Sequence, residues 1–565
     1  MTTPRLAVFA PLALLCTLAA AQQQVPAIRE TVDVTVANVD VVVTDRAGNR
    51  VRGLTSEDFE LIEDGVPQRI ANFAEFDENA IRLGIAMEAE APNLSRKAVP
   101  LEALSRRVVI YWDVSMDSPK TILQRRRIES AIATILDDLD PQDEVMFVSW
   151  NGTLNVEVAP TRDVAAVRDG IRRMVGAAPL GRVASKGGDP CDPTFQKRAF
   201  SVLVEENQRA SAALRTVLSR LMPLRGRKVL VLISQGFVAQ PALEVLLCGV
   251  PRGGGELNDP LLGEQGGRHM SAVMSRSLDR FAAGDLEELQ KSQDLMADLI
   301  STANAAGVTL YTIHGAGLVA PELAAGAGIS DEPLQQNYAS IGNSVAGLRR
   351  IAEETGGLVA GNTNDFEGPF RAIAADLGSY YSIGYRVSDA KREGDRRIEI
   401  RMRNPELTAR SRRSVSIRSP EAEVSDAVLA SLEFGDAAND LAISALPLPV
   451  TKTKRGRFAI PLELRIPLEP LSFIQERDSF AANVSIFIAA ADPKKTSTEV
   501  ERLDHRIEIS ATDFETIAGT YYTYRLSIDL RGRSAENRIA IGVLDQLSKM
   551  SGFTAVTVGA HAPPN

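Results

Sequence analysis

The chain is 565 residues long, which is enough for several domains. Hydrophobic residues make up 44% of it and charged residues 24%, a composition typical of folded globular proteins that excludes an intrinsically disordered chain. Acidic residues exceed basic ones by 73 − 63 = 10. The chain therefore lacks the cationic excess that neutralises nucleic-acid phosphates, and we expect no nucleic-acid partner.

Residues 1–21 have the features of a secretory signal peptide. Arg5 gives a positive start, residues 6–18 are mostly apolar, and Ala19–Ala21 fit a small-residue cleavage site. A single membrane-spanning helix is the alternative, but the segment is short for one. No later segment has about 18 uninterrupted apolar residues. We therefore expect an exported protein, periplasmic or extracellular, with no transmembrane span after cleavage.

Two cysteines, Cys191 and Cys248, remain once the signal segment is removed, and both lie in segments rich in Gly and Pro. Export permits a disulfide between them, and two separate free thiols are the equal alternative. The histidines have no cysteine partners at zinc-site spacing, so we expect no zinc site. They are His269, His314, His505 and His561.

The first predicted unit, residues 28–78, is a small antiparallel β unit. Val32, Val34 and Val36 alternate with polar residues, and turn residues follow at 45–49. A period of two interrupted by turns is typical of short paired strands.

The second predicted unit, residues 104–390, alternates short apolar strands with amphipathic helices. This alternation predicts an open, doubly wound, Rossmann-like α/β sheet, in which ligands bind outside the carboxyl ends of the strands. Two insertions interrupt it, at 177–195 and 238–282, and insertions of that length are often functional.

The remaining chain returns to β structure, as an extension over 391–418 and a β-sandwich over 419–560. The extension is basic at alternate positions, which predicts either a binding stripe or a solvated face. Its arginines are Arg396, Arg397, Arg401, Arg403, Arg410, Arg412 and Arg413.

Two sets of motifs resemble those of a known family. Residues 380–385 read YYSIGY, and a predicted helix before them ends in Thr355-Gly356-Gly357. The order and spacing over about residues 30–415 resemble the von Willebrand factor A (VWFA)-related proteins of acidobacteria and similar bacteria. The first unit carries the other motif, at Val41, Val43, Asp45, Gly48, Val51, Leu54, Asp58, Phe59, Glu63, Asp64, Gly65, Gln68 and Phe73.

The resemblance implies a metal-ion-dependent site after the first sheet strand, where residues 107–120 read RVVIYWDVSMDSPK. The family pattern is Asp-x-Ser-x-Ser, matched here by Asp113 and Ser115, with Asp117 at the third position. Thr194 is the candidate for a hydroxyl from a second loop, and Gln235 replaces the usual Asp of a third. Such oxygens suit Mg²⁺ or Mn²⁺, with one position left for a partner's carboxylate. The alternative is that Asp113 and Ser115 only cap a helix or bond the loop backbone.

These features favour a binding or adhesion-type protein that contacts a protein or surface polymer through the loop face of the α/β domain. A structural envelope component without metal is the first alternative. A hydrolytic enzyme is the second, because His314 ends a predicted strand near the same face, although we find no nucleophile elbow, metalloprotease motif or Ser/His/Asp set. We expect no enzyme.

Overall fold

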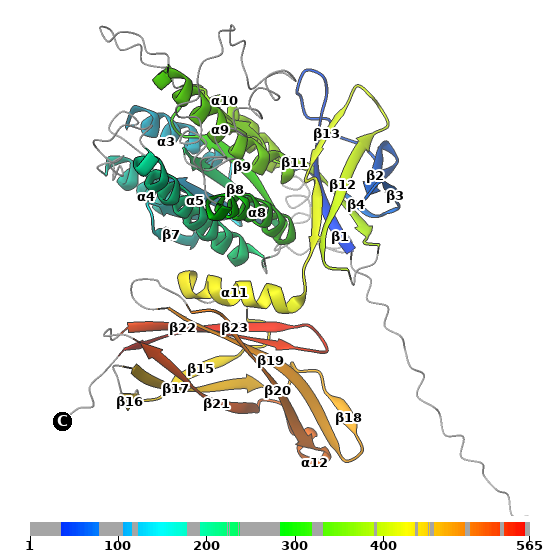
Figure 1. Ribbon diagram of the computed structural model, residues 1–565. Helices are drawn as coiled ribbons and strands as arrows, with labels where there is room; N and C mark the ends of the chain where they lie inside the picture. Colours follow the sequence, from blue (N-terminus) through cyan, green and yellow to red (C-terminus); the bar gives the residue numbers. More distant parts are fainter. Residues whose placement is uncertain are drawn as a thin grey trace, which may run out of the picture.

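The computed structural model folds into three units, which we call the α/β unit, the N-terminal β unit and the C-terminal β unit (Figure 1). The signal segment, both cysteines, all of the second insertion and most of the first lie outside the described residues. No helix in the described part of the chain is both long and apolar enough to cross a membrane. The structure describes residues 36–77, 105–115, 122–177, 193–222, 224, 226–235, 237, 283–318, 332–388, 392–435, 439–449, 451–452, 457–491, 498–531 and 536–559.

Six strands form the central sheet of the α/β unit, in the order β10-β9-β8-β5-β6-β7. All are parallel except β7, which runs antiparallel to β6. This is the order of a doubly wound sheet whose winding reverses between β5 and β8, as the alternation of strands and helices predicts. The strands are β5 (Arg106–Asp113), β6 (Glu144–Trp150), β7 (Leu154–Thr161), β8 (Arg227–Ser234), β9 (Val308–His314) and β10 (Val359–Ala360).

Alternate residues of these strands are buried under different helices. Val108, Ile110 and Trp112 of β5 pack on the face covered by α3, α4 and α10, whereas Val109 and Tyr111 pack on the face covered by α5, α8 and α9. Burial of both faces explains why the strands are almost wholly apolar. The helices are α3 (Ile122–Asp137), α4 (Val164–Gly176), α5 (Pro193–Leu221), α8 (Ala283–Ala306), α9 (Glu332–Glu354) and α10 (Glu367–Gly378).

The N-terminal β unit consists of two four-stranded sheets that share one apolar core. The first sheet has the order β13-β1-β11-β4 and the second the order β14-β12-β2-β3. A 3-10 turn, η1 (Ser56–Asp58), precedes β2. The strands are β1 (Val36–Thr44), β2 (Phe59–Glu63), β3 (Val66–Gln68), β4 (Ile70–Asp77), β11 (Ser379–Arg386), β12 (Gly394–Met402), β13 (Thr408–Ser411) and β14 (Ser414–Ile417).

This pairing differs from the expected domain limits. Strand β11 was expected to belong to the α/β domain of residues 104–390, but it lies between β1 and β4. The expected separate units, 28–78 and 391–418, likewise pair with each other through β2 and β12. The physical reason is burial: Tyr381, Ile383 and Tyr385 of β11 fill the core of this unit.

A buried carboxylate connects the N-terminal β unit to the α/β unit. Asp376 of α10 is fully buried, accepts a hydrogen bond from the Tyr311 hydroxyl of β9 at 2.8 Å, and pairs with Arg50 and Arg410 of the β unit. Two guanidinium groups thus neutralise a carboxylate that would otherwise be costly to bury.

The basic extension therefore does not present one uniform stripe. Arg396 is buried against Glu63 and Arg412 donates to the Asn304 carbonyl of α8, whereas Arg401 is exposed beside Glu399. Because successive strand residues face opposite sides of a sheet, some arginines of this extension pack in the interior and others lie in solvent.

Lys228 of β8 is half-buried near this junction. Its ammonium group donates to the carbonyls of Met222 at 3.3 Å and Leu224 at 3.0 Å. Burial, followed by the nearby Arg412 charge, lowers the pKa of Lys228 to about 8, while Asp40 and Glu423 oppose the shift. A protonated Lys228 is therefore a cost to the folded state at neutral pH.

The C-terminal β unit has two sheets facing each other across an apolar core. In one, β17 pairs with β15, β16 and β21; in the other, β19 pairs with β18, β20 and β22, and β22 with β23. The elements are β15 (Ser444–Pro447), β16 (Thr451–Lys452), β17 (Arg457–Pro467), β18 (Ile474–Glu476), β19 (Ser479–Ala491), β20 (Glu501–Ser510), α12 (Ala511–Phe514), β21 (Tyr521–Arg531), β22 (Glu536–Asp545) and β23 (Ser551–Gly559).

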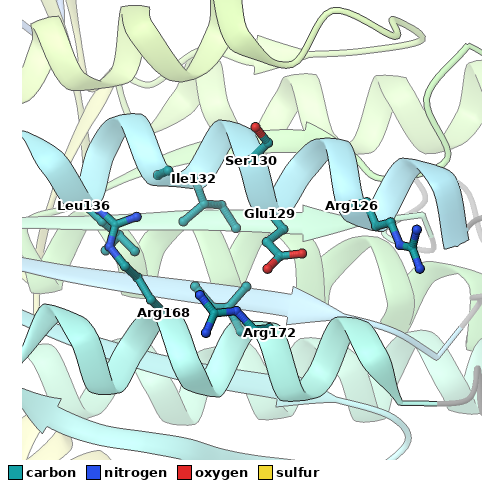
Figure 2. A pocket seen from close by; sticks show the side chains of 9 residues that line it. Arg126, Glu129, Ser130, Ile132, Leu136, Arg168 and Arg172 are labelled. Carbon is teal, nitrogen blue, oxygen red and sulfur yellow. The ribbon is translucent and has the colours of Figure 1, made fainter.

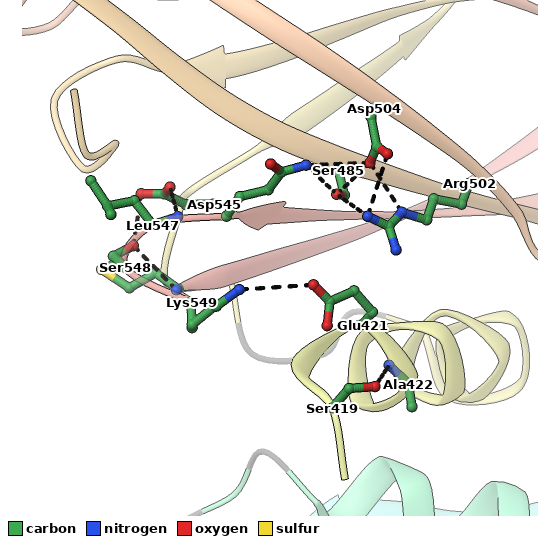
Figure 3. Close-up of polar contacts among 12 residues, drawn as sticks. Ser419, Glu421, Ala422, Ser485, Arg502, Asp504, Asp545, Leu547, Ser548 and Lys549 are labelled. Carbon is green, nitrogen blue, oxygen red and sulfur yellow. Dashed lines mark hydrogen bonds and ion pairs between the residues drawn. The ribbon is translucent and has the colours of Figure 1, made fainter. Parts of the chain in front are cut away.

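Helix α11 (Pro420–Phe434) lies between this unit and the α/β unit (Figures 1 and 3). Its apolar side packs with β19, β22 and β23. On its other side Asp426 pairs with Arg215 of α5 at 3.3 Å, and Lys549 pairs with Glu421 at 3.8 Å near its start. Ser419 caps the helix by accepting from the Ala422 N–H.

We predict that Asp376→Asn lowers the free energy of unfolding by about 3–5 kcal/mol, because it leaves two largely buried guanidinium groups without their carboxylate. Urea denaturation followed by circular dichroism measures the change. Glu367→Gln is the control on the same helix, since Glu367 is exposed and pairs only with Arg371. Equal stability of the two variants would contradict the role assigned to Asp376.

We predict that Lys228→Met changes how stability depends on pH. The folded pKa of Lys228, about 8, lies below its ordinary value of 10.5, so the wild type gains stability as pH rises through this interval. The gain is on the order of 3 kcal/mol, and Lys228→Met should lose it. Denaturation midpoints at pH 7 to 10.5 measure the difference, with the exposed Lys291→Met as control. Parallel profiles for wild type and Lys228→Met would contradict the prediction.

Candidate functional site

The candidate site lies at the carboxyl edge of the central sheet, where β5 and β8 end side by side. Trp112 is opposite Ile233 in the parallel register, so Asp113 and Ser234, the last residues of the two strands, are neighbours. Ligands of doubly wound sheets bind at this reversal point because the following segments leave in opposite directions. Val114 continues the edge by donating its N–H to the Trp150 carbonyl at 2.8 Å.

Among the described residues, Asp113 accepts three hydrogen bonds, all from neutral groups. Its Oδ1 accepts from the Ser115 N–H at 3.0 Å and the Ser115 hydroxyl at 2.6 Å, and its Oδ2 accepts from the Ser234 hydroxyl at 2.7 Å. The side chains come from the end of β5, the turn after it and the end of β8. Three side chains, from the two strand ends and the turn after β5, thus gather around one carboxylate.

Asp113 is only 3% exposed. Burial raises the pKa of its carboxyl group, and the hydrogen bonds from Ser115 and Ser234 oppose the rise. Within the described part of the chain, no arginine, lysine or histidine forms an ion pair with it. A buried carboxylate without a counter-charge is costly, and the cost disappears when a cation binds.

Another buried carboxylate in the structure differs from Asp113 in the type of its hydrogen-bond donors. Asp545 of β22, which is fully buried, also has neutral partners, but two of them are backbone N–H groups, from Ser472 and Leu547. Figure 3 shows Asp545 beside Leu547 and Ser548. A backbone N–H can only donate, whereas a serine hydroxyl can rotate and offer a lone pair to a cation. Two of the three described donors to Asp113 are such hydroxyls. Both can rotate to present their oxygen atoms to a cation.

Of the five residues expected to bind metal, the structure brings Asp113 and Ser115 together. Asp117 lies outside the described residues. Thr194 is the second residue of α5, and its side chain is likewise outside the description. Gln235 follows β8 and its carbonyl accepts from the Ser344 hydroxyl of α9 at 3.2 Å.

The residues present partly fit a hard divalent cation. One carboxylate and two hydroxyls supply oxygen, the donor type that Mg²⁺ and Mn²⁺ use, and Asp113 has no cationic partner among the described residues. Among the described residues no three His, Cys, Asp or Glu side chains gather as metal ligands. A cation here would therefore depend on hydroxyl and water oxygens as well as Asp113.

The sequence placed His314 near this loop face, but neither His314 nor Ser234 was among the predicted ligands. Ser234 ends β8 and His314 ends β9, directly opposite each other in the register. Both are the last residues of apolar strand segments, and this signal, combined with the doubly wound strand order, is sufficient to place them at the same edge as Asp113.

A separate cavity of about 290 Å³ lies between α3 and α4 (Figure 2). Arg168 on its rim pairs with Asp137, and Arg172 pairs with Asp169. It includes none of the residues of the carboxyl edge. Its lining residues are Arg126, Glu129, Ser130, Ile132, Ala133, Leu136, Arg168, Ile171 and Arg172.

No protein-family model and no curated protein matches the chain. Among solved structures, it is similar to the conserved hypothetical protein BatB from Bacteroides thetaiotaomicron, with 12% identity over 48% of this chain and 96% of that chain and a TM-score of 0.22. It is also similar to a von Willebrand factor type A protein from Catenulispora acidiphila, with 11% identity, 81% and 66% coverage and a TM-score of 0.22.

The pilus adhesin SpaC from Lactobacillus rhamnosus GG is a third such structure, with 9% identity over 88% of this chain and 59% of that chain and a TM-score of 0.23. Likenesses of this size establish neither family nor function. We therefore base the proposals below on the residues and strand order of this chain.

We predict that Ser234→Ala destabilises the protein more than Ser115→Ala. Loss of the Ser234 hydroxyl leaves Oδ2 of Asp113 without its hydrogen bond, which costs roughly 1–3 kcal/mol. Ser115→Ala keeps the backbone N–H bond to Oδ1 and should cost less. Urea titrations in the presence of chelator measure both. The reverse order of stability would contradict this view of Asp113.

Proposed function

We propose that the chain is an exported, VWFA-type binding protein of the adhesion class. It engages a protein or surface polymer through the carboxyl edge of the α/β sheet, and a divalent cation, Mg²⁺ or Mn²⁺, held by Asp113, Ser115 and Ser234 completes the binding site. The motifs of residues 41–73 and 355–385 support the family, and the signal-like segment supports export.

One observation carries the proposal: Asp113 is a buried carboxylate, at the reversal point of the sheet, whose described partners are neutral. Elsewhere in the fold, buried carboxylates such as Asp376 and Asp143 have arginine partners. A carboxylate without a counter-charge at a ligand-binding edge is better explained by a cation that binds together with the ligand than by a contribution to the stability of the fold.

The chain's own residues would orient the cation. Asp113 supplies the negative charge. Ser115 donates to its Oδ1 atom and Ser234 of β8 donates to its Oδ2 atom, which fixes the orientation of the carboxylate. A bound cation would supply an open coordination position for a carboxylate of the partner. Asp117 and Gln235, which follow the same two strand ends, remain candidate ligands.

The residues support binding better than hydrolysis. Ser234 donates a hydrogen bond to Asp113. A nucleophilic serine instead donates to a histidine base within hydrogen-bond reach. A structural envelope component without metal is the remaining alternative. In that case the hydrogen bonds of Asp113 would only fix the local backbone.

Calorimetric titration with Mg²⁺ and Mn²⁺ tests the cation. We expect saturable binding to one site in the wild type and at least roughly tenfold weaker binding in Asp113→Asn, since the variant removes the only carboxylate among the described ligands. Asp545→Asn is the matched control, a buried aspartate with neutral partners in another unit. Equal binding by Asp113→Asn and the wild type would contradict the proposed site.

Immobilised protein tests the binding role. A surface partner should be retained by the wild type and by Asp545→Asn in Mn²⁺, released by chelator, and not retained by Asp113→Asn. Retention that chelator does not affect would contradict the cation-dependent mechanism and favour the metal-free alternative.

A further inference from the structure

Three buried polar side chains form one row across the carboxyl edge of the sheet. His314 of β9 lies opposite Ser234 of β8, and Asp113 of β5 lies on the other side of Ser234. Their exposed fractions are 3% for Asp113, 0% for Ser234 and 3% for His314. Adjacent strands are about 4.8 Å apart, so Asp113 and His314 flank Ser234 with about 10 Å between their backbones.

The three side chains also share a face of the sheet. Tyr111, Leu232 and Leu310 belong to the core under α5, α8 and α9. Side chains two or four residues further along the same strands return to that face. Asp113 and Ser234 stand two residues after Tyr111 and Leu232, and His314 stands four after Leu310, so the row faces α5, α8 and α9.

The imidazole of His314 is hydrogen-bonded to the Gly317 backbone, but one of its two ring nitrogens is left over. Its Nδ1 atom is buried and has no hydrogen-bond partner among the described residues. Burial lowers the pKa of His314, which keeps the ring neutral, and the backbone of Gly317 opposes the shift. A neutral imidazole nitrogen is a metal ligand. By contrast, Nε2 of His505 in the C-terminal β unit is 2.8 Å from the Tyr522 hydroxyl.

We propose that His314 provides a nitrogen ligand to the cation at Asp113 and Ser234, so that the site selects Mn²⁺ or Co²⁺ over Mg²⁺ and Ca²⁺. This inference rests on the proposed cation site and specifies its metal class. A cation above Ser234 is within reach of Asp113 from one neighbouring strand and of His314 from the other. Mg²⁺ and Ca²⁺ take oxygen ligands, whereas imidazole suits transition metals.

Titration of the whole protein with Mn²⁺ and Mg²⁺ tests the selectivity. We expect the wild type to bind Mn²⁺ at least roughly tenfold more tightly than Mg²⁺, because Mg²⁺ is bound through oxygen ligands and gains little from an imidazole. His314→Phe keeps an aromatic ring of similar size and should lose the preference while Mg²⁺ binding is unchanged. His505→Phe is the control and should keep the preference.

Pulsed electron paramagnetic resonance of Mn²⁺ bound to the wild type tests the ligand without any variant. A nitrogen hyperfine coupling that changes when histidine is labelled with ¹⁵N supports the inference, provided that His505→Phe retains it. Binding of both ions without that coupling would overturn the inference and leave the oxygen-only site intact. Absence of any binding by the wild type would overturn both the inference and the proposed function.

Discussion

The reversal of winding between β5 and β8 is the constraint on which the candidate site depends. Two parallel strands from different halves of the α/β unit end beside each other there, so residues 121 positions apart, Asp113 and Ser234, share a hydrogen bond. The helices that follow the two strands, α3 and α8, pack on opposite faces of the sheet, as is typical of the reversal point of a doubly wound sheet. A buried carboxylate is costly without a counter-charge.

Two other buried carboxylates hold elements of different units together. Asp376 joins the α/β unit to the N-terminal β unit through Arg50 and Arg410, and Asp426 joins α11 to α5 through Arg215. Each of these two carboxylates has a guanidinium partner. Asp113, like Asp545 in the C-terminal β unit, has neutral partners among the described residues.

The motifs that carry the family resemblance also serve the architecture. Gly356 has a positive φ of 81°, and a Cβ atom on Gly357 would collide with the Leu310 carbonyl oxygen. Both glycines lie where α9 ends against β9 and β13. Tyr381 and Tyr385 fill the core of the N-terminal β unit. The residues that carry the resemblance therefore serve the packing of the units. For this reason the resemblance indicates an architecture more firmly than a function.

Local periodicity predicted most strands and helices, because the apolar residues of β5, β8 and α3 follow the spacing that burial on one or two faces requires. It did not predict the partners of β11, since pairing with β1 joins residues more than three hundred positions apart. For the same reason, a motif on one strand indicated Asp113 and Ser115, whereas the strand order was needed to place Ser234 and His314 beside Asp113. Local pattern specifies which residues are buried, and topology specifies which of them meet.

The most direct test of the central claim is an anomalous difference map from crystals of the protein grown with Mn²⁺. We predict a peak at the carboxyl edge of β5 and β8, bonded to an Asp113 oxygen and adjacent to the Ser234 hydroxyl. A map without a peak at that edge, in which Ser115 and Ser234 still donate to Asp113, would contradict the claim and indicate that these contacts serve only the fold.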